Sequence, residues 1–229
     1  DPGILAAVRA NPEKYRIICA HVPYAFRSLL ADDYVTLTVL RDPVTRTISY
    51  LKHCRRYHKE HMGLPLERIY EDDWFHASFI ANSQTKLFSM TAEETLAQTR
   101  YGDYSPAMPP RAELGNGENL TPELIALGDR GGGRFSMEVF AASTGVIDID
   151  DRRFEIAKDN LRATDVVGVT EDYSHFLGKL VSEHGWKVDV VPHRHVSENE
   201  DISPDLLRRI VQDNEADAEL HQFARSLSG

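Results

Sequence analysis

A short apolar run that ends abruptly in a polar turn constrains the fold more than any other part of this sequence. Residues 34–40 (Tyr-Val-Thr-Leu-Thr-Val-Leu) are apolar and β-branched, which is typical of a strand. Asp42 and Pro43 follow at once and suit the N-cap and first turn of a helix, expected over residues 44–57. The sequence therefore predicts a strand, a tight turn and a helix, which is the repeating unit of α/β folds.

The same alternation recurs along the rest of the chain. Strands separated by helices favour one parallel central sheet, covered by helices on both faces, that binds ligands beyond the carboxyl ends of its strands. We expect an α/β fold in a single domain over residues 1–229, with a loop-rich insertion around residues 101–134. Further strands are expected over residues 15–20, 165–169 and 186–191, and further helices over residues 66–75, 77–88, 92–99, 152–162, 172–184 and 203–223.

The charge balance excludes some classes of partner. The chain has 229 residues and a formal net charge of −10 at pH 7. An acidic surface argues against binding to nucleic acid or to an anionic membrane, and no apolar run reaches the roughly 20 residues that a membrane span needs. With only two cysteines, Cys19 and Cys54, we expect no disulfide framework and a reducing compartment.

An arginine and a serine flank the predicted turn. Arg41 follows the strand, and Ser49 lies one to two helical turns further on. An anion held there would meet a guanidinium, a hydroxyl and the positive end of a helix dipole, which together suit a phosphate. The alternative is that Arg41 pairs with Asp42 or Asp32 and that Ser49 only packs.

Six segments fall in the order of one known family. Arg-Asp-Pro-Val-Thr-Arg-Thr-Ile-Ser-Tyr (41–50) resembles the 3′-phosphate motif of sulfotransferases that use 3′-phosphoadenosine 5′-phosphosulfate (PAPS), especially the carbohydrate type related to uronyl and heparan sulfate 2-O-sulfotransferases. The order of the matches carries more weight than any one of them. The other similar segments are Cys-Ala-His-Val-Pro-Tyr (19–24), Asn-Ser-Gln-Thr-Lys-Leu-Phe (82–88), Ala-Lys-Asp-Asn-Leu (157–161), Val-Gly-Val-Thr-Glu (167–171) and Asp-Ala-Glu-Leu-His-Gln-Phe-Ala (217–224).

The resemblance implies a P-loop-like sulfotransferase fold and an enzyme that transfers a sulfuryl group from PAPS to a hydroxyl. The product nucleotide would be 3′-phosphoadenosine 5′-phosphate (PAP), and the reaction needs no metal. The acceptor would be a carbohydrate or another small molecule, with a glycan or glycolipid favoured. The compartment would be the cytoplasm in a bacterium or the Golgi lumen in a eukaryote.

His21 is the expected general base. It follows a predicted strand, and the family's catalytic histidine occupies the matching position. Imidazole titrates near neutral pH, so it can take the proton of an acceptor hydroxyl as the O–S bond forms. The alternative is a structural histidine bonded to a carbonyl group.

The remaining site residues are expected around the nucleotide and the acceptor. Arg194 lies in the loop after the family's last strand, which closes on the nucleotide. Gln84 and Lys86 could reach the acceptor or the sulfuryl group, and Arg55 lies in a basic helix segment that could steer an anionic ligand. A solvated helix face is the alternative for these last three residues. The expected nucleotide-binding residues are Arg41, Ser49 and Arg194, and the expected acceptor-binding residues are Gln84, Lys86 and Arg55.

One family feature has no counterpart in this sequence. The family's first strand and its Pro-Lys-x-Gly loop wrap the 5′-phosphosulfate and supply a lysine, but nothing before His21 resembles them. Residues 1–10 resemble the end of the helix that follows that loop, so we expect the loop to be omitted from the sequence. A relative that binds nucleotide or glycan without turnover is the alternative function. An ATP-dependent kinase is a third, but no Walker or protein-kinase motif set is present.

Two other patterns resemble binding sites. Cys54, His58 and His61 have a helical spacing that would suit zinc, with His76 conceivable as a fourth ligand. No paired Cys/His signature accompanies them, and we expect no metal. The glycine-rich residues 128–136 have arginine where a phosphate-binding loop has lysine and lack the preceding strand, so a hinge or lid is expected there.

Overall fold

The strand and helix predicted around Asp42 both form. β1 (Leu37–Leu40) leads through Arg41 and Asp42 into α2 (Pro43–Tyr57). Asp42 is the N-cap of α2, and its Oδ1 accepts a hydrogen bond of 2.8 Å from the Thr45 N–H. The prediction of a capped helix with proline in its first turn is therefore confirmed.

The computed structural model describes residues 8, 14, 17–19, 21–30, 34–97, 144–188 and 201–228. The predicted insertion at 101–134 and the glycine-rich segment at 128–136 lie outside these residues. The other elements are the 3₁₀-helices η2 (Tyr24–Leu29) and η5 (Thr170–Asp172), the π-helix η3 (His76–Ile80), the strand β2 (Val166–Val169), and the α-helices α3 (Leu66–Tyr70), α4 (Asp73–Phe75), α5 (Ser83–Ser89), α6 (Ala92–Ala97), α9 (Asp151–Arg162), α10 (Tyr173–His184), α11 (Pro204–Asp213) and α12 (Glu215–Ser228).

The two strands form a small parallel sheet. Leu37 lies opposite Val166, and Leu40 lies opposite Val169. A helix-rich chain with parallel strands is compatible with the predicted α/β class. The described parts of the other two predicted strands, residues 17–19 and 186–188, are not in strand conformation. Ile17 shows why, because it is 66% exposed, and a β-branched residue favours a strand only where it packs against neighbours.

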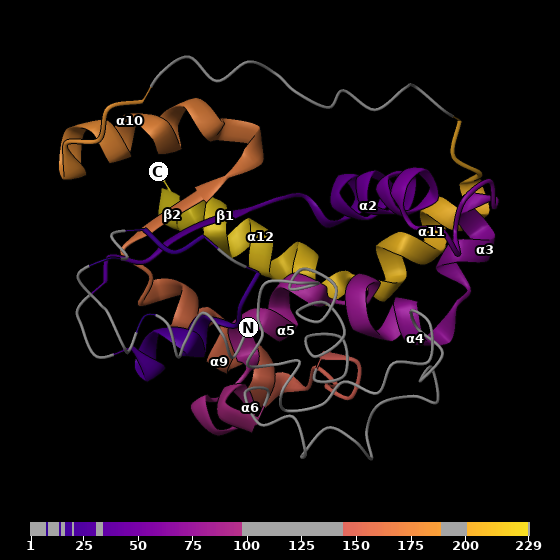
Figure 1. The fold of residues 1–229 in the computed structure, drawn as a ribbon, viewed down its shortest axis with the longest axis horizontal. Coiled ribbons are helices and arrows are strands. Elements are labelled where there is room, and N and C mark those ends of the chain that lie inside the picture. Colours follow the sequence, from indigo (N-terminus) through magenta and orange to yellow (C-terminus); the bar gives the residue numbers. More distant parts are fainter. Residues whose placement is uncertain are drawn as a thin grey trace.

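Successive residues of β2 pack against different helices. Figure 1 shows α10 and α12 beside the small sheet. Val166 lies in one apolar cluster with Phe176 and Leu180 of α10. Val167 and Val169 lie in another, with residues of α9 and of α12. Side chains alternate across a strand, so β2 holds α10 apart from α9 and α12. This packing fixes the carboxyl ends of both strands.

Gly168 lies where α10 approaches β2 most closely. A Cβ atom at Gly168 would be 2.5 Å from Cδ2 of Phe176. We expect Gly168→Ala to lower the free energy of unfolding by about 1–3 kcal/mol, because the packed ring has to move. Gly178→Ala in α10 is the matched control, since a Cβ there meets no atom within 4 Å, and it should stabilise by about 0.5–1 kcal/mol. Urea unfolding measures both, and equal stabilities would contradict this packing.

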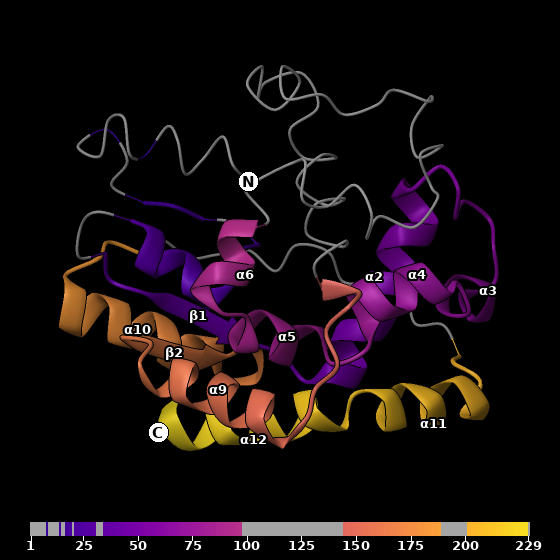
Figure 2. The same ribbon diagram turned by 90° about the horizontal axis from the view of Figure 1, so that it is seen from below.

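Two predicted helices are divided where an asparagine intervenes. The helix expected over residues 203–223 is divided into α11 and α12. These two helices follow one another along one edge of the molecule in Figure 2. Between them Asn214 donates from Nδ2 to the Ile210 carbonyl at 2.9 Å and accepts the Asn82 N–H at 3.1 Å. Asn82 itself has a left-handed φ of 48° and separates η3 from α5 within the helix expected over residues 77–88. Asparagine side chains compete with helical bonds in this way.

The helix expected over residues 66–75 is also divided, into α3 and α4. Asp72 provides the reason, because its Oδ1 accepts the Phe75 N–H at 3.0 Å and starts a new helix there. Among the described helices, none is both long enough and apolar enough to cross a membrane.

Candidate functional site

A cavity of about 820 Å³ runs along β1 as far as Arg41. Its walls come from residues 17–30, β1, the first turn of α2 and α5. The charged side chains among its described lining residues are Arg27, Arg41 and Arg46, and no Asp or Glu is among them. In a chain of net charge −10 this is a local excess of positive charge. Such a cavity suits an anionic ligand.

His21 and Arg41, the two residues on which the sequence analysis depends most, line this same cavity. His21 is exposed, and Arg41 is half-buried. No ion pair joins Arg41 to Asp42, which caps α2 instead, and the other partner considered, Asp32, lies outside the described residues. A bound ligand can therefore reach both the imidazole and the guanidinium.

Gln84 of α5 holds the backbone of Arg41 in place. Its Oε1 accepts the Arg41 N–H at 3.0 Å, and its Nε2 donates to the Arg41 carbonyl at 2.9 Å. Gln84 also lines the cavity, but both ends of its amide are used by this backbone. The geometry gives it a positioning role, and its contact with an acceptor stays a prediction.

Arg46 is a lining residue that the sequence analysis did not single out. Its guanidinium donates to the Phe79 carbonyl at 3.2 Å and lies 5.8 Å from the centre of the Tyr50 ring. Burial lowers the pKa of Arg46, and the Asp217 carboxylate opposes that shift. Arg46 lies one helical turn after the Asp42 cap, and this spacing is the signal that could have revealed it. Arg27 lies in η2, where no periodic pattern marks it.

Asp217 connects α12 to the start of α5. Its side chain is fully buried and accepts the N–H groups of Gln84 and Thr85 at 3.1 and 2.6 Å and the Thr85 hydroxyl at 2.7 Å. In return, the Asp217 N–H donates to Oδ1 of Asn82 at 3.1 Å. The segment that positions Arg41 is therefore itself fixed by α12.

Glu171 supports the turn after β1 from the end of β2. Its Oε1 accepts the Asp42 N–H at 3.0 Å, and its Oε2 lies 3.0 Å from Nε2 of His221. Burial disfavours the charged carboxylate, but the bonds from the Asp42 N–H and from His221 outweigh it and hold the pKa of Glu171 below its ordinary value. Four segments that resemble the family, at 41–50, 82–88, 167–171 and 217–224, thus meet around one turn.

The other predicted site residues that the structure describes do not line the cavity, apart from Gln84. Lys86 is 5% exposed, does not line the cavity and donates from Nζ to the Ala77 carbonyl at 2.7 Å, and burial lowers its pKa. Ser49 is half-buried and also does not line the cavity. Arg55 lies in the last turn of α2, about 20 Å from Arg41 at the helical rise. Arg194 lies outside the described residues.

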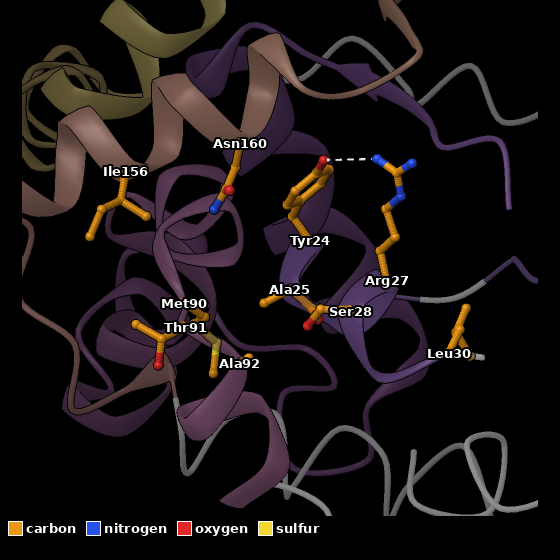
Figure 3. Close-up of a pocket in the computed structure, with 10 residues that line it drawn as sticks. All are labelled: Tyr24, Ala25, Arg27, Ser28, Leu30, Met90, Thr91, Ala92, Ile156 and Asn160. Carbon is orange, nitrogen blue, oxygen red and sulfur yellow. Dashed lines mark hydrogen bonds between the residues drawn. The ribbon is translucent and has the colours of Figure 1, made fainter. Parts of the chain in front are cut away.

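A second cavity, of about 530 Å³, lies between η2, the start of α6 and α9 (Figure 3). η2 contributes Tyr24 and Arg27 to both cavities, and Arg27 donates to the Tyr24 hydroxyl at 3.4 Å. The Tyr24 hydroxyl donates to the Ala163 carbonyl at 3.0 Å, and Asn160 donates to the Phe88 carbonyl at 2.6 Å. These bonds tie η2 and α5 to the end of α9. The wall of the larger cavity that η2 and α5 form is therefore fixed by α9.

Comparison of the chain with protein-family models, with curated proteins and with solved structures finds no match. The residues that line the larger cavity are therefore the basis for assigning a function.

Proposed function

We propose that the chain transfers a sulfuryl group from PAPS to a hydroxyl of a carbohydrate or another small acceptor. The observation that carries the proposal is that His21 and Arg41 line one cavity whose charged lining residues are otherwise arginines. A volume of about 820 Å³ is within the range of about 300–1,000 Å³ for ligand sites. The meeting of four family-like segments around Arg41 supports the same assignment, as does the order of the six segments in the sequence.

In this proposal the acceptor oxygen attacks sulfur in line with the bridging oxygen of the phosphosulfate. An O–S bond forms to the acceptor while the S–O bond to the phosphate breaks, and PAP leaves with the bonding electrons. His21 takes the acceptor's proton. Charge gathers on the leaving phosphate and on the sulfuryl oxygens, where fixed cations stabilise it most. Arg41 and Arg46 are the cations proposed to bind the nucleotide. Arg194 remains a predicted contact, whereas Ser49 is not proposed as one because it does not line this cavity.

The binding half of the proposal is tested by Arg41→Ala. Losing a charged hydrogen bond to the 3′-phosphate should weaken PAP binding by about 1.5–3 kcal/mol, or about 10–150-fold in Kd, when measured by calorimetry on the full-length protein. Arg56→Ala is the matched control, because Arg56 is exposed on α2 and does not line the cavity. Adenosine 5′-phosphate and ATP, which lack the 3′-phosphate, should bind weakly to the wild type. Equal affinity for ATP and PAP would contradict the assignment.

The catalytic half is tested by transfer of labelled sulfate from PAPS to a panel of hydroxyl-bearing glycans. The alternative is a protein that binds the nucleotide or a glycan without turnover. It is supported by the three arginines among the described lining residues, which could hold the phosphates of a nucleotide without any transfer. PAP binding that depends on Arg41, without any sulfate transfer by the full-length protein, would decide for this alternative.

A further inference from the structure

A cysteine and two histidines come together at the end of α2, away from the cavity. Sγ of Cys54 and ring nitrogens of His58 and His61 all lie within 4.8 Å of one another. Cys54 is fully buried, His58 is half-buried and His61 is 4% exposed. The proposed sulfuryl transfer does not use this thiol or these two imidazoles, and an apolar core does not need polar rings at these positions.

The backbone holds the three residues together. The His58 N–H donates to the Cys54 carbonyl at 2.8 Å and closes the last turn of α2. The His61 N–H then donates to the His58 carbonyl at 2.9 Å, and the Leu64 N–H donates to the His61 carbonyl at 3.1 Å. Gly63 permits this tight turn with a φ of 76°. The three donor atoms therefore converge through local hydrogen bonds.

Aromatic side chains form a wall beside the cluster. The His61 ring meets Phe75 edge to face at 5.1 Å between ring centres, and it stacks with His58 at 5.9 Å. Cys54, Phe75 and Leu51 belong to the largest apolar cluster of the described chain. Water therefore has little access on the inner side, while the half-buried His58 faces the outer side. An ion could enter from there.

We propose that Cys54, His58 and His61 bind a zinc ion or another divalent cation that prefers thiolate and imidazole ligands. One thiolate and two imidazoles are ligands that zinc prefers over the oxygen ligands of magnesium or calcium. Ligand atoms in a tetrahedral site lie about 3.3–3.6 Å apart, as follows from Zn–N and Zn–S bonds of about 2.0–2.3 Å. Separations of up to 4.8 Å require the ligand atoms to close by about 1 Å, which small changes in the side-chain torsions of the three residues supply.

Water fills the fourth position in this proposal. His76 is conceivable as a fourth ligand from its place in the sequence, but its Nε2 lies 3.0 Å from Oδ2 of Asp213, which also accepts the Tyr70 hydroxyl. Cys54 lies about 20 Å along α2 from Arg41 at the helical rise. The metal therefore does not act on the proposed reaction, and it fastens the end of α2 to the turn over residues 58–64.

Cobalt(II) tests the site directly, since it replaces zinc and absorbs strongly when a thiolate binds it. The full-length protein, stripped with a chelator, should bind one equivalent of Co²⁺ with a thiolate-to-metal charge-transfer band, and Zn²⁺ should displace it. Zn²⁺ should also raise the midpoint of thermal unfolding, because it binds the folded state. A stripped protein that gives no such band would overturn the proposal.

Two pairs of variants assign the ligands. Cys54→Ser should abolish the band, while Cys19→Ser, which removes the exposed second thiol, should retain it. His58→Gln should weaken Co²⁺ binding at least about tenfold, and His53→Gln on the same helix should not. If Cys54→Ser does not fold, His58→Gln carries the test, because its side chain is half-buried. A band that survives in a folded Cys54→Ser, or equal affinities for the two histidine variants, would contradict the site.

Discussion

Replacing His21 with alanine is expected to slow sulfuryl transfer by about 10²–10⁴-fold and to leave the affinity for PAP nearly unchanged. The imidazole is proposed to take a proton only as the O–S bond forms, so its loss acts on the transition state and not on the bound nucleotide. His21 is exposed, and its removal should not affect folding. The measurement pairs kcat from labelled-sulfate transfer with Kd for PAP from calorimetry.

Two further variants separate proton transfer from other roles of His21. His21→Gln keeps a hydrogen-bonding side chain but cannot accept a proton near neutral pH, so it should be about as slow as His21→Ala. His175→Ala removes an exposed histidine of α10 that does not line the cavity, and it should leave kcat unchanged. A His21→Gln variant with wild-type kcat would show that His21 positions the acceptor and is not the base. A loss of PAP affinity equal to the loss of kcat would reject the proposed division of roles.

Local signals explain which parts of the fold could be predicted from sequence. The turn after β1 was predictable because its cap, its proline and the preceding β-branched run all lie within ten residues. The same holds for α9, where the Asp150 Oδ1 accepts the Arg153 N–H at 2.7 Å and starts the helix one residue before its expected range. Short-range chemistry determines these elements almost alone.

Long-range contacts explain where the predictions are wrong. Asn214 interrupts the last predicted helix partly because it bonds to Asn82, which is 132 residues away in sequence. A periodic apolar pattern continues through such a position, so it predicts one helix where the structure has two. The failure of residues 17–19 to form a strand has a similar cause, since strand propensity depends on neighbours that only the fold supplies.

The candidate site also has residues whose place could be predicted from the sequence and residues whose contacts could not. His21 and Arg41 line one cavity, as their order in the sequence suggested, although the described residues of the strand expected before His21 are not in strand conformation. The uses of Gln84 and Lys86 could not be predicted, because their partners are backbone groups at Arg41 and Ala77. Both residues lie in a segment that resembles the family, yet the structure gives them partners within the protein. Resemblance in a motif therefore identifies residues that build a site as well as residues that would touch a ligand.

Asp217→Ala tests that distinction and should have the largest effect on stability. It would leave the N–H groups of Gln84 and Thr85 and the Thr85 hydroxyl without their acceptor in a fully buried place. It would also remove the carboxylate that favours the charged forms of Arg46 and Lys86. We expect a loss of about 3–5 kcal/mol in the free energy of unfolding, measured by urea denaturation, because breaking a buried polar cluster leaves its partners unpaired.

Matched changes show whether the loss arises from these bonds. Asp217→Asn keeps one acceptor oxygen of the same shape and should lose less than Asp217→Ala, whereas Glu219→Ala on the exposed side of α12 should stay within about 0.5 kcal/mol of the wild type. Where Asp217→Asn remains folded, PAP should bind more weakly, since Gln84 would hold the Arg41 backbone less firmly. An Asp217→Ala protein within about 1 kcal/mol of the wild type would mean that α12 does not fix this turn, and the positioning of Arg41 would then need another cause.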